Sequence, residues 1–423
     1  MKSIDEFSRP RSTISPMERP FRSLLRRLVD EEIMPHRREY DEDWEKHEYI
    51  EPVIHKLCVD LGIQKALFPQ ECGGWSLGQS DYMMALAYCI AEEVGRGDSA
   101  LSLSSICSLW PLCTFLIPPL VNMDLAKRLA PLFTGDTLCI GCQAMTEPQG
   151  GSDIENMDLI RGKTITTTAR QEGGHWVING HKLWPTNSGG IATIFGVPCT
   201  TKPGSDDPDD FAYIMVPADT EGVTQSTPYA KAGMAADKNG DIWFENVRVP
   251  LAYRVHGPGT DALAFKGLIY MGQLGSVGFA VGALMNIYEI LYDFASTRTF
   301  GNRLLKENDA IAAMLGDLAG AVDICRVLAY EVVRLGDDRN KPWGSPIYSE
   351  ETTAKARNIK EFICDKAVEI SGRAMDILGA YGCDRVWDIE KHWRDLKMIQ
   401  LWLGGKQLCQ MEKARYYFNC ETL

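Results

Sequence analysis

The periodicity of apolar residues changes twice along this chain of 423 residues, and this change constrains the fold more than any other feature. Up to about residue 137, apolar side chains recur every three or four residues, as in Leu24, Leu25 and Leu28, which is typical of amphipathic helices. From 138 to 255, short segments rich in Val, Ile, Thr and aromatic residues alternate with Gly, Asn, Asp and Pro, which indicates strands and turns. Long helical runs then return.

These three zones predict an α+β protein that is mainly helical. We expect an N-terminal helical domain over residues 1–137, a middle domain over 138–255 and a C-terminal four-helix bundle over 256–423. The short strands of the middle domain suit an antiparallel sheet or a small β-barrel. The long helices are expected at about 261–297, 309–336 and 350–378 and again after residue 388.

Several local signals make narrower predictions. Asn179-Gly180 lies between two apolar segments and predicts a two-residue hairpin turn. Asp81 and Asp98 each precede an apolar helical segment and predict N-caps. Cys139 and Cys142 form a CxxC pair, which is found in redox pairs and zinc sites. No second pair or spaced histidines complete a metal site, so we interpret the two cysteines as small apolar residues of a buried strand and expect no metal.

Charge and composition exclude whole classes of function. The formal net charge is −13 and no basic run stands out, which argues against nucleic-acid binding. The polar N-terminal segment has no apolar core of a signal peptide, and no apolar run reaches the roughly 18–20 residues of a membrane span. The 13 cysteines are irregularly spaced, which favours free thiols in a reducing compartment. We therefore expect a cytoplasmic protein.

Four segments carry a resemblance to a known family. Residues 143–153 read Gln-Ala-Met-Thr-Glu-Pro-Gln-Gly-Gly-Ser-Asp and 178–187 read Ile-Asn-Gly-His-Lys-Leu-Trp-Pro-Thr-Asn. Residues 298–301 read Arg-Thr-Phe-Gly, and 377–382 read Ile-Leu-Gly-Ala-Tyr-Gly ahead of Trp393-Arg394-Asp395. In this order they resemble the "TEPxAGSD", "INGxKxWITN", "RxxFG" and "ILGGxG…RD" motifs of acyl-CoA dehydrogenases. The resemblance implies an FAD-dependent oxidoreductase that acts on the CH–CH bond of an acyl-CoA thioester.

The resemblance also implies where FAD binds. In this family the flavin lies between the β domain and the C-terminal helices. The positions that match the family's FAD contacts are Gln143, Met145, Thr146, Ser152, Trp184, Thr186, Arg298, Gly379 and Gly404. Trp184 would cover one face of the flavin, and Thr186 would bond near its N5 atom. Arg298 and Gly379 match positions that bind the FAD pyrophosphate across a subunit interface, which implies a homotetramer (a dimer of dimers) or at least a dimer. Electron-transferring flavoprotein is the redox partner that the resemblance implies.

The carboxylate that most family members use as catalytic base has no counterpart at the matching positions. Leu403 stands where the family's Glu follows the Arg-Asp motif, and the helical alternative at residues 270–274 has no Asp or Glu either. A base must lie within hydrogen-bond reach of the proton it removes. Asp98 is the carboxylate we would test, although its sequence context favours an N-cap. Tyr270, Tyr381 and Cys107 are further candidates.

Three functions remain open from the sequence. The first is oxidation of an unusual acyl-CoA, cyclic, unsaturated or branched, with a non-standard base. The second is a reductase or a lyase (a desulfinase or decarboxylase) on the same scaffold, and the third is a non-catalytic FAD-binding subunit of a hetero-oligomer. The residues expected to contact the substrate are Ser152, Leu403, Trp402 and Cys107, and the bulky side chains among them favour a ring or a branched chain.

Overall fold

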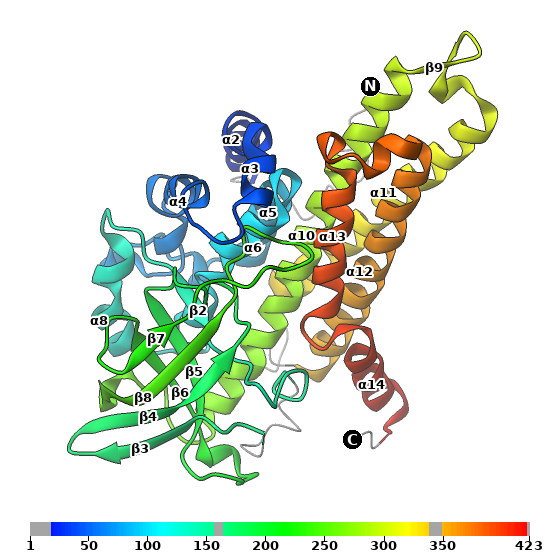
Figure 1. Ribbon diagram of the computed structural model, residues 1–423. Helices are drawn as coiled ribbons and strands as arrows, with labels where there is room; N and C mark the ends of the chain where they lie inside the picture. Colours follow the sequence, from blue (N-terminus) through cyan, green and yellow to red (C-terminus); the bar gives the residue numbers. More distant parts are fainter. Residues whose placement is uncertain (1–17, 156–163, 338–348, 421–423) are drawn as a thin grey trace.

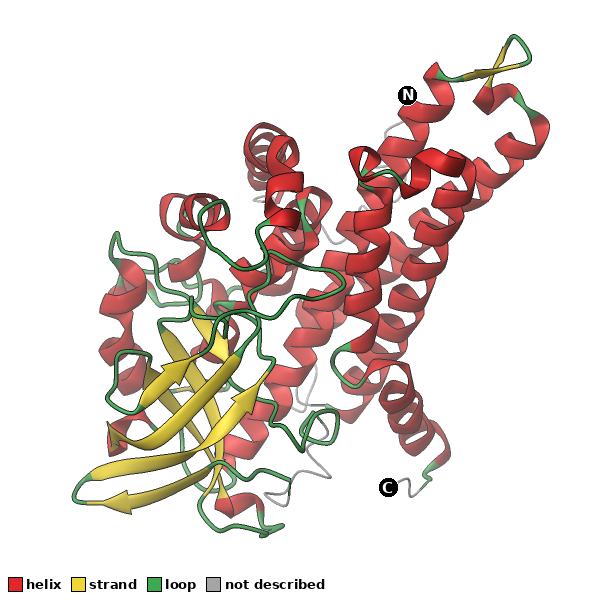
Figure 2. Cartoon of the chain, viewed as in Figure 1, coloured by secondary structure: helices red, strands yellow, loops and turns green. Residues whose placement is uncertain are grey.

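The computed structural model describes residues 18–155, 164–337 and 349–420. Helices, a β-sheet and a second set of longer helices follow one another along the chain, as Figure 1 shows by colour and Figure 2 by secondary structure. The N-terminal helices and the sheet lie on the same side of the long helix α10, and the other long helices lie on its opposite side. The predicted α+β fold class is thereby confirmed.

The N-terminal helices pack around α5, which is buried at most positions because α2, α6 and α10 surround it. A π-helical turn at Val29–Ile33 extends α2. The α-helices of this part are α2 (Glu18–Leu28), α3 (Arg37–Glu42), α4 (Ile50–His55), α5 (Met83–Gly97), α6 (Ser99–Cys107), α7 (Cys113–Leu116) and α8 (Met123–Thr134). The short strand β1 (Leu120–Val121) folds back on the end of α7.

The start of α5 is capped from a distant element. Its N-cap residue, Tyr82, makes no side-chain capping bond. Instead, the carboxylate of Asp337 accepts hydrogen bonds from the backbone N–H groups of Met84 and Ala85 at 2.8 and 3.0 Å. The prediction of an N-cap at Asp81 is therefore wrong, because a residue at the end of α11 supplies the acceptor.

The middle domain is a seven-stranded sheet in the order β2-β5-β3-β4-β8-β7, with β6 paired to β5. Most neighbouring strands are antiparallel, as expected. The strands β2 and β3, however, both run parallel to β5, because a long connection rather than a tight turn separates each of these pairs. The strands are β2 (Gly141–Gln143), β3 (Thr168–Glu172), β4 (His175–Leu183), β5 (Ile194–Thr200), β6 (Phe211–Pro217), β7 (Val223–Gln225) and β8 (Asp241–Pro250).

The hairpin turn predicted at Asn179-Gly180 is wrong. Both residues lie inside β4, where the pairing with β8 shifts register between Ile178 and Gly180. The turn is at Gly173-Gly174, where both φ angles are positive, as a two-residue hairpin requires. Gly180 has a packing role instead, since a Cβ there would lie 2.4 Å from the Thr167 hydroxyl oxygen.

The C-terminal helices are long and antiparallel, and their bounds agree closely with the sequence prediction. They are α10 (Thr260–Thr297), α11 (Asp309–Asp337), α12 (Glu350–Leu378), α13 (Ile389–Leu401) and α14 (Gly405–Phe418). The short strands β9 (Thr299–Phe300) and β10 (Arg303–Leu304) form the hairpin beyond α10. Glycines let α10 approach α5 closely: a Cβ on Gly278 would meet Ala91 at 2.4 Å, and one on Gly282 would meet the Glu92 carbonyl oxygen at 2.3 Å.

Two helical segments are long and apolar enough to cross a membrane by length and composition alone. They are Ser99–Leu116 and Thr260–Thr297, so the expectation that no segment is long and apolar enough is not met. In each, 83% of the apolar window is buried inside the protein. Their apolar side chains thus form the core between the domains rather than an exposed band.

Candidate active site

A mainly apolar cavity lies where the three parts of the chain meet. It has a volume of about 500 Å³. Its inner wall is almost entirely apolar and comes from α5, the segment from α6 to α7, and α10, including Tyr88, Ile106, Trp110 and Met271. Its polar lining comes from the ends of β2 and β4, from the loop before β8 and from the turn between α13 and α14. An apolar pocket with a few convergent polar groups is the common form of a ligand site.

Most of the side chains singled out in the sequence line this cavity. The ends of β2 and β4 bring together Gln143, Met145, Thr146, Trp184 and Thr186. The loop after β2 adds Ser152, and the turn between α13 and α14 adds Gly404. The expected substrate contacts Cys107, Trp402 and Leu403 lie in the same wall. Residues from 107 to 404 thus meet in one cavity, as the fold resemblance implies.

A buried ion pair fixes the two strand ends to each other. The Lys182 ammonium lies 2.8 Å from the Glu147 carboxylate, and both side chains are fully buried. The same carboxylate accepts hydrogen bonds from the hydroxyl groups of Thr166 and Thr167 at 2.6 and 2.7 Å. Burial alone would raise the pKa of Glu147, but Lys182 and the threonines lower it to about 2. The Glu of this motif therefore positions the cavity wall and takes no part in proton transfer.

Three bulky residues that line the cavity have a strained backbone. Trp184, Met234 and Leu403 line it and have positive φ angles of 69°, 55° and 50°, and Asn187 nearby has 69°. Positive φ is costly for bulky residues and is found mainly where surrounding contacts impose it, often at functional sites. The positions of Trp184 and Leu403 are thus held by the tertiary structure.

The polar wall has the groups that an isoalloxazine ring needs. Gln143 is buried, its Oε1 atom accepts a hydrogen bond from Tyr213, and its Nε2 atom has no partner within the described chain. An unpaired buried donor is costly unless a ligand accepts its bond. The indole of Trp184 stacks on Tyr229 with ring centroids 4.4 Å apart and is about half exposed at the cavity. A flat acceptor-rich ring such as a flavin fits these groups.

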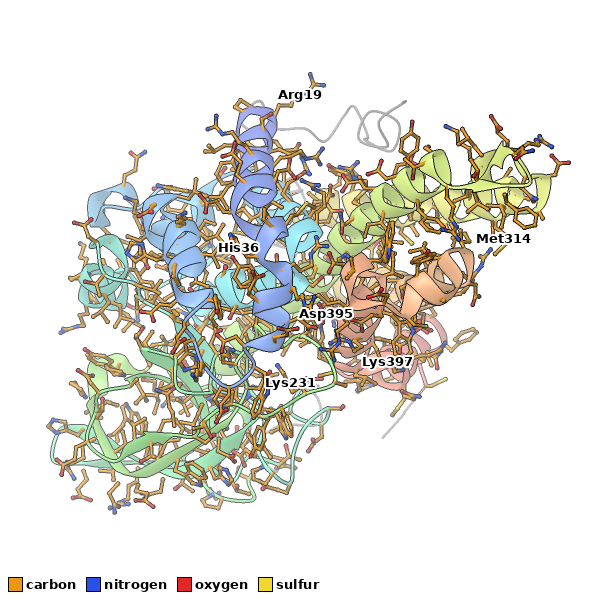
Figure 3. The ribbon with its side chains drawn as sticks, turned by 45° about the horizontal axis from the view of Figure 1, so that its top comes forward. Arg19, His36, Lys231, Met314, Asp395 and Lys397 are labelled. Carbon is orange, nitrogen blue, oxygen red and sulfur yellow. The ribbon has the colours of Figure 1, made fainter. Side chains whose placement is uncertain are left out.

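Asp98 does not line the cavity, which contradicts its proposed role as base. Its carboxylate accepts hydrogen bonds from Ala100 N and Leu101 N, so the alternative prediction of an N-cap is confirmed. It also pairs with the Lys391 ammonium at 2.8 Å, and Lys391 contacts Asp395 at 2.6 Å. Figure 3 shows Asp395 and Lys231 at the junction between the bundle and the β domain. The carboxylates of Asp98 and Asp395 therefore hold domains together.

The other candidate bases are unsuitable for different reasons. Cys107 lines the cavity, but burial and the charge of Asp237 hold the pKa of its thiol well above the usual value. Tyr270 is fully buried and its hydroxyl faces the Val332 carbonyl oxygen at 3.4 Å, outside the lining. Tyr381 lies about half exposed beyond the end of α10. None of the three combines access to the cavity with a basic group near neutral pH.

Arg298 and Gly379 lie together, but away from the cavity. The Arg298 guanidinium stacks over the rings of Tyr381 and Phe294, at 4.7 and 5.5 Å from their centroids. Gly379, with a φ of 62°, ends α12 two residues before Tyr381. Both residues are exposed, so within one protomer they make no part of the cavity wall.

Two carboxylates in the lining were missed in the sequence. Glu155 follows the Gly-Gly-Ser-Asp motif by two residues, and Asp237 precedes β8 in a loop. Asp237 lies near Thr186, with 3.4 Å between their oxygens, and 3.6 Å from the Lys231 ammonium. Acidic residues just outside a motif have no pattern of their own, because only the folded chain shows which of them are buried.

Comparison with known proteins agrees with this geometry. Family models match residues 15–117, 142–247 and 263–414, as the N-terminal, middle and C-terminal domains of acyl-CoA dehydrogenases. A probable acyl-CoA dehydrogenase of Bacillus subtilis is 27% identical over 93% of this chain and 96% of the relative. Cyclohexane-1-carbonyl-CoA dehydrogenase of Syntrophus aciditrophicus is 28% identical over 92% of this chain and 94% of its own length. The structure of butyryl-CoA dehydrogenase from Megasphaera elsdenii superposes with a TM-score of 0.81 at 20% identity, covering 96% of this chain and 99% of that one.

Proposed function

The chain belongs to the acyl-CoA dehydrogenase family of oxidoreductases, and from this premise we propose that it uses FAD to oxidise a cyclic or branched acyl-CoA at its Cα–Cβ bond. The observation that carries the proposal is the lining of the cavity, which is mainly apolar with a few polar groups on the side of the β domain. The apolar part, the chamber, suits the acyl group. The polar side suits the thioester and the flavin.

Bulky side chains give the chamber its shape. Trp110 donates a hydrogen bond from Nε1 to the Leu268 carbonyl oxygen at 2.8 Å, and Trp402 donates from its own Nε1 to the Ser276 hydroxyl at 2.6 Å. These bonds fix both indoles as rigid walls. A compact ring or branched group has less conformational entropy to lose in such a chamber than a flexible alkyl chain.

The residues of the polar side would hold the cofactor. Gln143, Thr146 and Ser152 offer hydrogen bonds to its polar edge, and the Trp184 indole offers a flat surface to its ring. When bound, the flavin of FAD supplies a two-electron acceptor for the hydride from Cβ. The protein then has to orient the thioester, exclude water and accept the α-proton.

Anaerobic mixing of the purified full-length protein with acyl-CoA thioesters tests this function. Butyryl-CoA, isobutyryl-CoA and cyclohexane-1-carbonyl-CoA form the panel, and loss of the visible absorption of oxidised flavin is the readout. We expect the cyclic or branched thioester to bleach the flavin fastest. If these thioesters shift the spectrum without bleaching it, oxidation is excluded, and a reductase or lyase reaction replaces it.

Gly272→Ala tests the shape of the chamber. A Cβ at this position would lie 2.1 Å from the Trp110 ring and 2.9 Å from Leu403 Cδ1, so one of these side chains must move into the cavity. We expect kcat/KM for the bulkiest thioester to fall by about 10-fold or more relative to butyryl-CoA. Gly320→Ala on α11, where a Cβ would meet nothing within 4 Å, is the matched control. Equal losses for all thioesters would contradict this assignment of the acyl site.

A further inference from the structure

The two carboxylates that line the cavity within the described chain lie against different parts of its wall. Asp237 is on the side of Thr186 and Lys231, next to the groups expected to face the flavin. Glu155, from the loop after β2, lies against the turn between α13 and α14. The backbone amides of Leu403 and Gly404 in this turn face its carboxylate. Glu155 thus lies beside Leu403, the residue that occupies the usual position of the base.

Leu403 itself contributes only an apolar surface. Its Cδ1 atom lies against α10 at Gly272, next to the Trp110 ring. Its backbone has a φ of 50°, which fixes this turn in a conformation that few non-glycine residues adopt. A carboxylate that acts as base next to Leu403 must therefore come from another element. The loop after β2 brings Glu155 to this position.

One oxygen of the Glu155 carboxylate has no hydrogen-bond partner within the described chain. The side chain is only 8% exposed, and its Oε2 atom makes no hydrogen bond within the part of the chain that the structure describes. A buried carboxylate oxygen without a partner is costly, and such groups are retained mainly where function needs them. Because Glu155 is part of the cavity wall, a proton of a bound ligand is the partner that we infer for this carboxylate.

We propose that Glu155 is the catalytic base of this protein and removes the α-proton of the acyl-CoA in place of the carboxylate absent at Leu403. The inference rests on the proposed function. The Cα–H bond breaks and its proton goes to Glu155. The electron pair of that bond forms the Cα=Cβ bond while hydride leaves Cβ for the flavin of FAD, the two-electron acceptor. The thioester loses one proton and one hydride and becomes an enoyl thioester.

The electrostatic environment suits a base that works near neutral pH. Burial raises the pKa of Glu155 to about 7, and the charges of Lys360 and Arg357 with the amides of Gly404 and Leu403 limit this rise. Lys360 is held by the Trp402 carbonyl oxygen at 2.8 Å, and Arg357 pairs with Glu412. A base is most effective when its pKa is close to the working pH, since it then is both ionised and sufficiently basic.

Exchange of the α-proton with solvent deuterium isolates the proposed step. The FAD-loaded protein is reduced first, so that oxidation cannot proceed, and deuterium uptake by cyclohexane-1-carbonyl-CoA or isobutyryl-CoA is followed by mass spectrometry. We expect Glu155→Gln to slow exchange by at least about 100-fold and Glu155→Asp to slow it less. FAD content and Tm should stay at wild-type values. The wild-type exchange rate should rise with pH to a plateau with a midpoint near 7, and Glu155→Gln should lose this dependence.

Glu245→Gln, at an exposed carboxylate of β8, controls for the loss of one charge. Wild-type exchange in Glu155→Gln would overturn the assignment, and loss of exchange in Asp237→Asn alone would transfer it to Asp237. If Glu155→Gln does not fold, the pH profile of the wild type and the rate of Glu155→Asp decide instead. A wild type that bleaches its flavin but does not depend on Glu155 leaves the proposed function intact. If the wild-type protein shows neither exchange of the α-proton nor bleaching of its flavin, both the assignment of Glu155 and the proposed function are wrong.

Discussion

At the scale of single residues, the polar groups around the cavity divide into those that hold the wall and those left available to a ligand. Glu147 and Lys182 pair with each other beside the strand ends that form the wall. Gln143 and Glu155 line the cavity, and each keeps one buried polar atom without a hydrogen-bond partner in the described chain. Buried polar atoms are normally paired, so these two lining residues are the ones for which a ligand would supply the partner.

The ion pair of Glu147 with Lys182 predicts a pH dependence of stability. The pKa of Glu147 is about 2 in the folded protein, below its ordinary value of 4.5. The corresponding stabilisation, roughly 3 kcal/mol, is therefore present above pH 4.5 and lost as the pH falls from 4.5 toward 2. Chemical denaturation at pH 7 and pH 3 should show a smaller acid loss for Glu147→Gln than for wild type. Glu245→Gln, at an exposed carboxylate of β8, should keep the wild-type acid loss.

Asp98→Asn separates a structural role from a catalytic one. Asparagine can still cap α6, but it removes one charge facing Lys391, so we expect a loss of roughly 2 kcal/mol in the free energy of unfolding. The rate of α-proton exchange in the folded variant should equal that of wild type. An exchange rate reduced by 100-fold with unchanged stability would restore Asp98 as the base.

At the scale of elements, the helices depend on contacts that are distant in sequence. The N-terminus of α5 takes its cap from Asp337 on α11, and the close approach of α5 to α10 depends on Gly278 and Gly282. Arg22 of α2 bonds Glu92 and Glu93 of α5 at 2.9 and 2.6 Å, and Arg326 of α11 also pairs with Glu92. These contacts hold α5, one wall of the acyl chamber, between the N-terminal helices and the bundle.

Asp337→Ala tests the cap from α11. It removes the acceptor for two backbone N–H groups at the start of α5, and we expect a loss of about 1 kcal/mol in the free energy of unfolding. Asp81→Ala should cost less, because Asp81 does not cap this helix. The comparison is made by urea denaturation of both variants. A larger effect at Asp81 would mean that the local sequence signal determines the helix start.

At the scale of the whole molecule, no single domain contains the site. The cavity takes its walls from the N-terminal helices, the sheet and the bundle, so its shape depends on how the three pack. The Arg298 guanidinium stacks on Tyr381 just after the end of α10, and neither residue lines this cavity. Phe300, in the strand β9 that follows Arg298, is 72% exposed. We propose that this end meets the FAD of another subunit, as the family resemblance implies for a homotetramer.

Arg298→Ala tests that arrangement. Because a guanidinium bonds two phosphate oxygens at once, its loss should weaken FAD binding by about 10-fold or more in the oligomer. The Tm of the apoprotein should change little, since Arg298 is exposed. Fluorescence of released FAD and light scattering measure retention and oligomeric state. Unchanged FAD retention in an intact oligomer would remove Arg298 from the cofactor site.

The sequence by itself determined the order of the elements and most of the polar wall. The long helices and the helix–sheet–helix order follow from apolar periodicity, which is local, and Trp184, Thr186 and Gln143 lie in contiguous motifs that the chain carries to strand ends. Only the tertiary structure decided that Asp98 is a cap, that β4 continues through Asn179-Gly180, and that Glu155 is buried beside Leu403. The physical reason is that burial, register and the pKa of a carboxylate depend on neighbours that are distant along the chain.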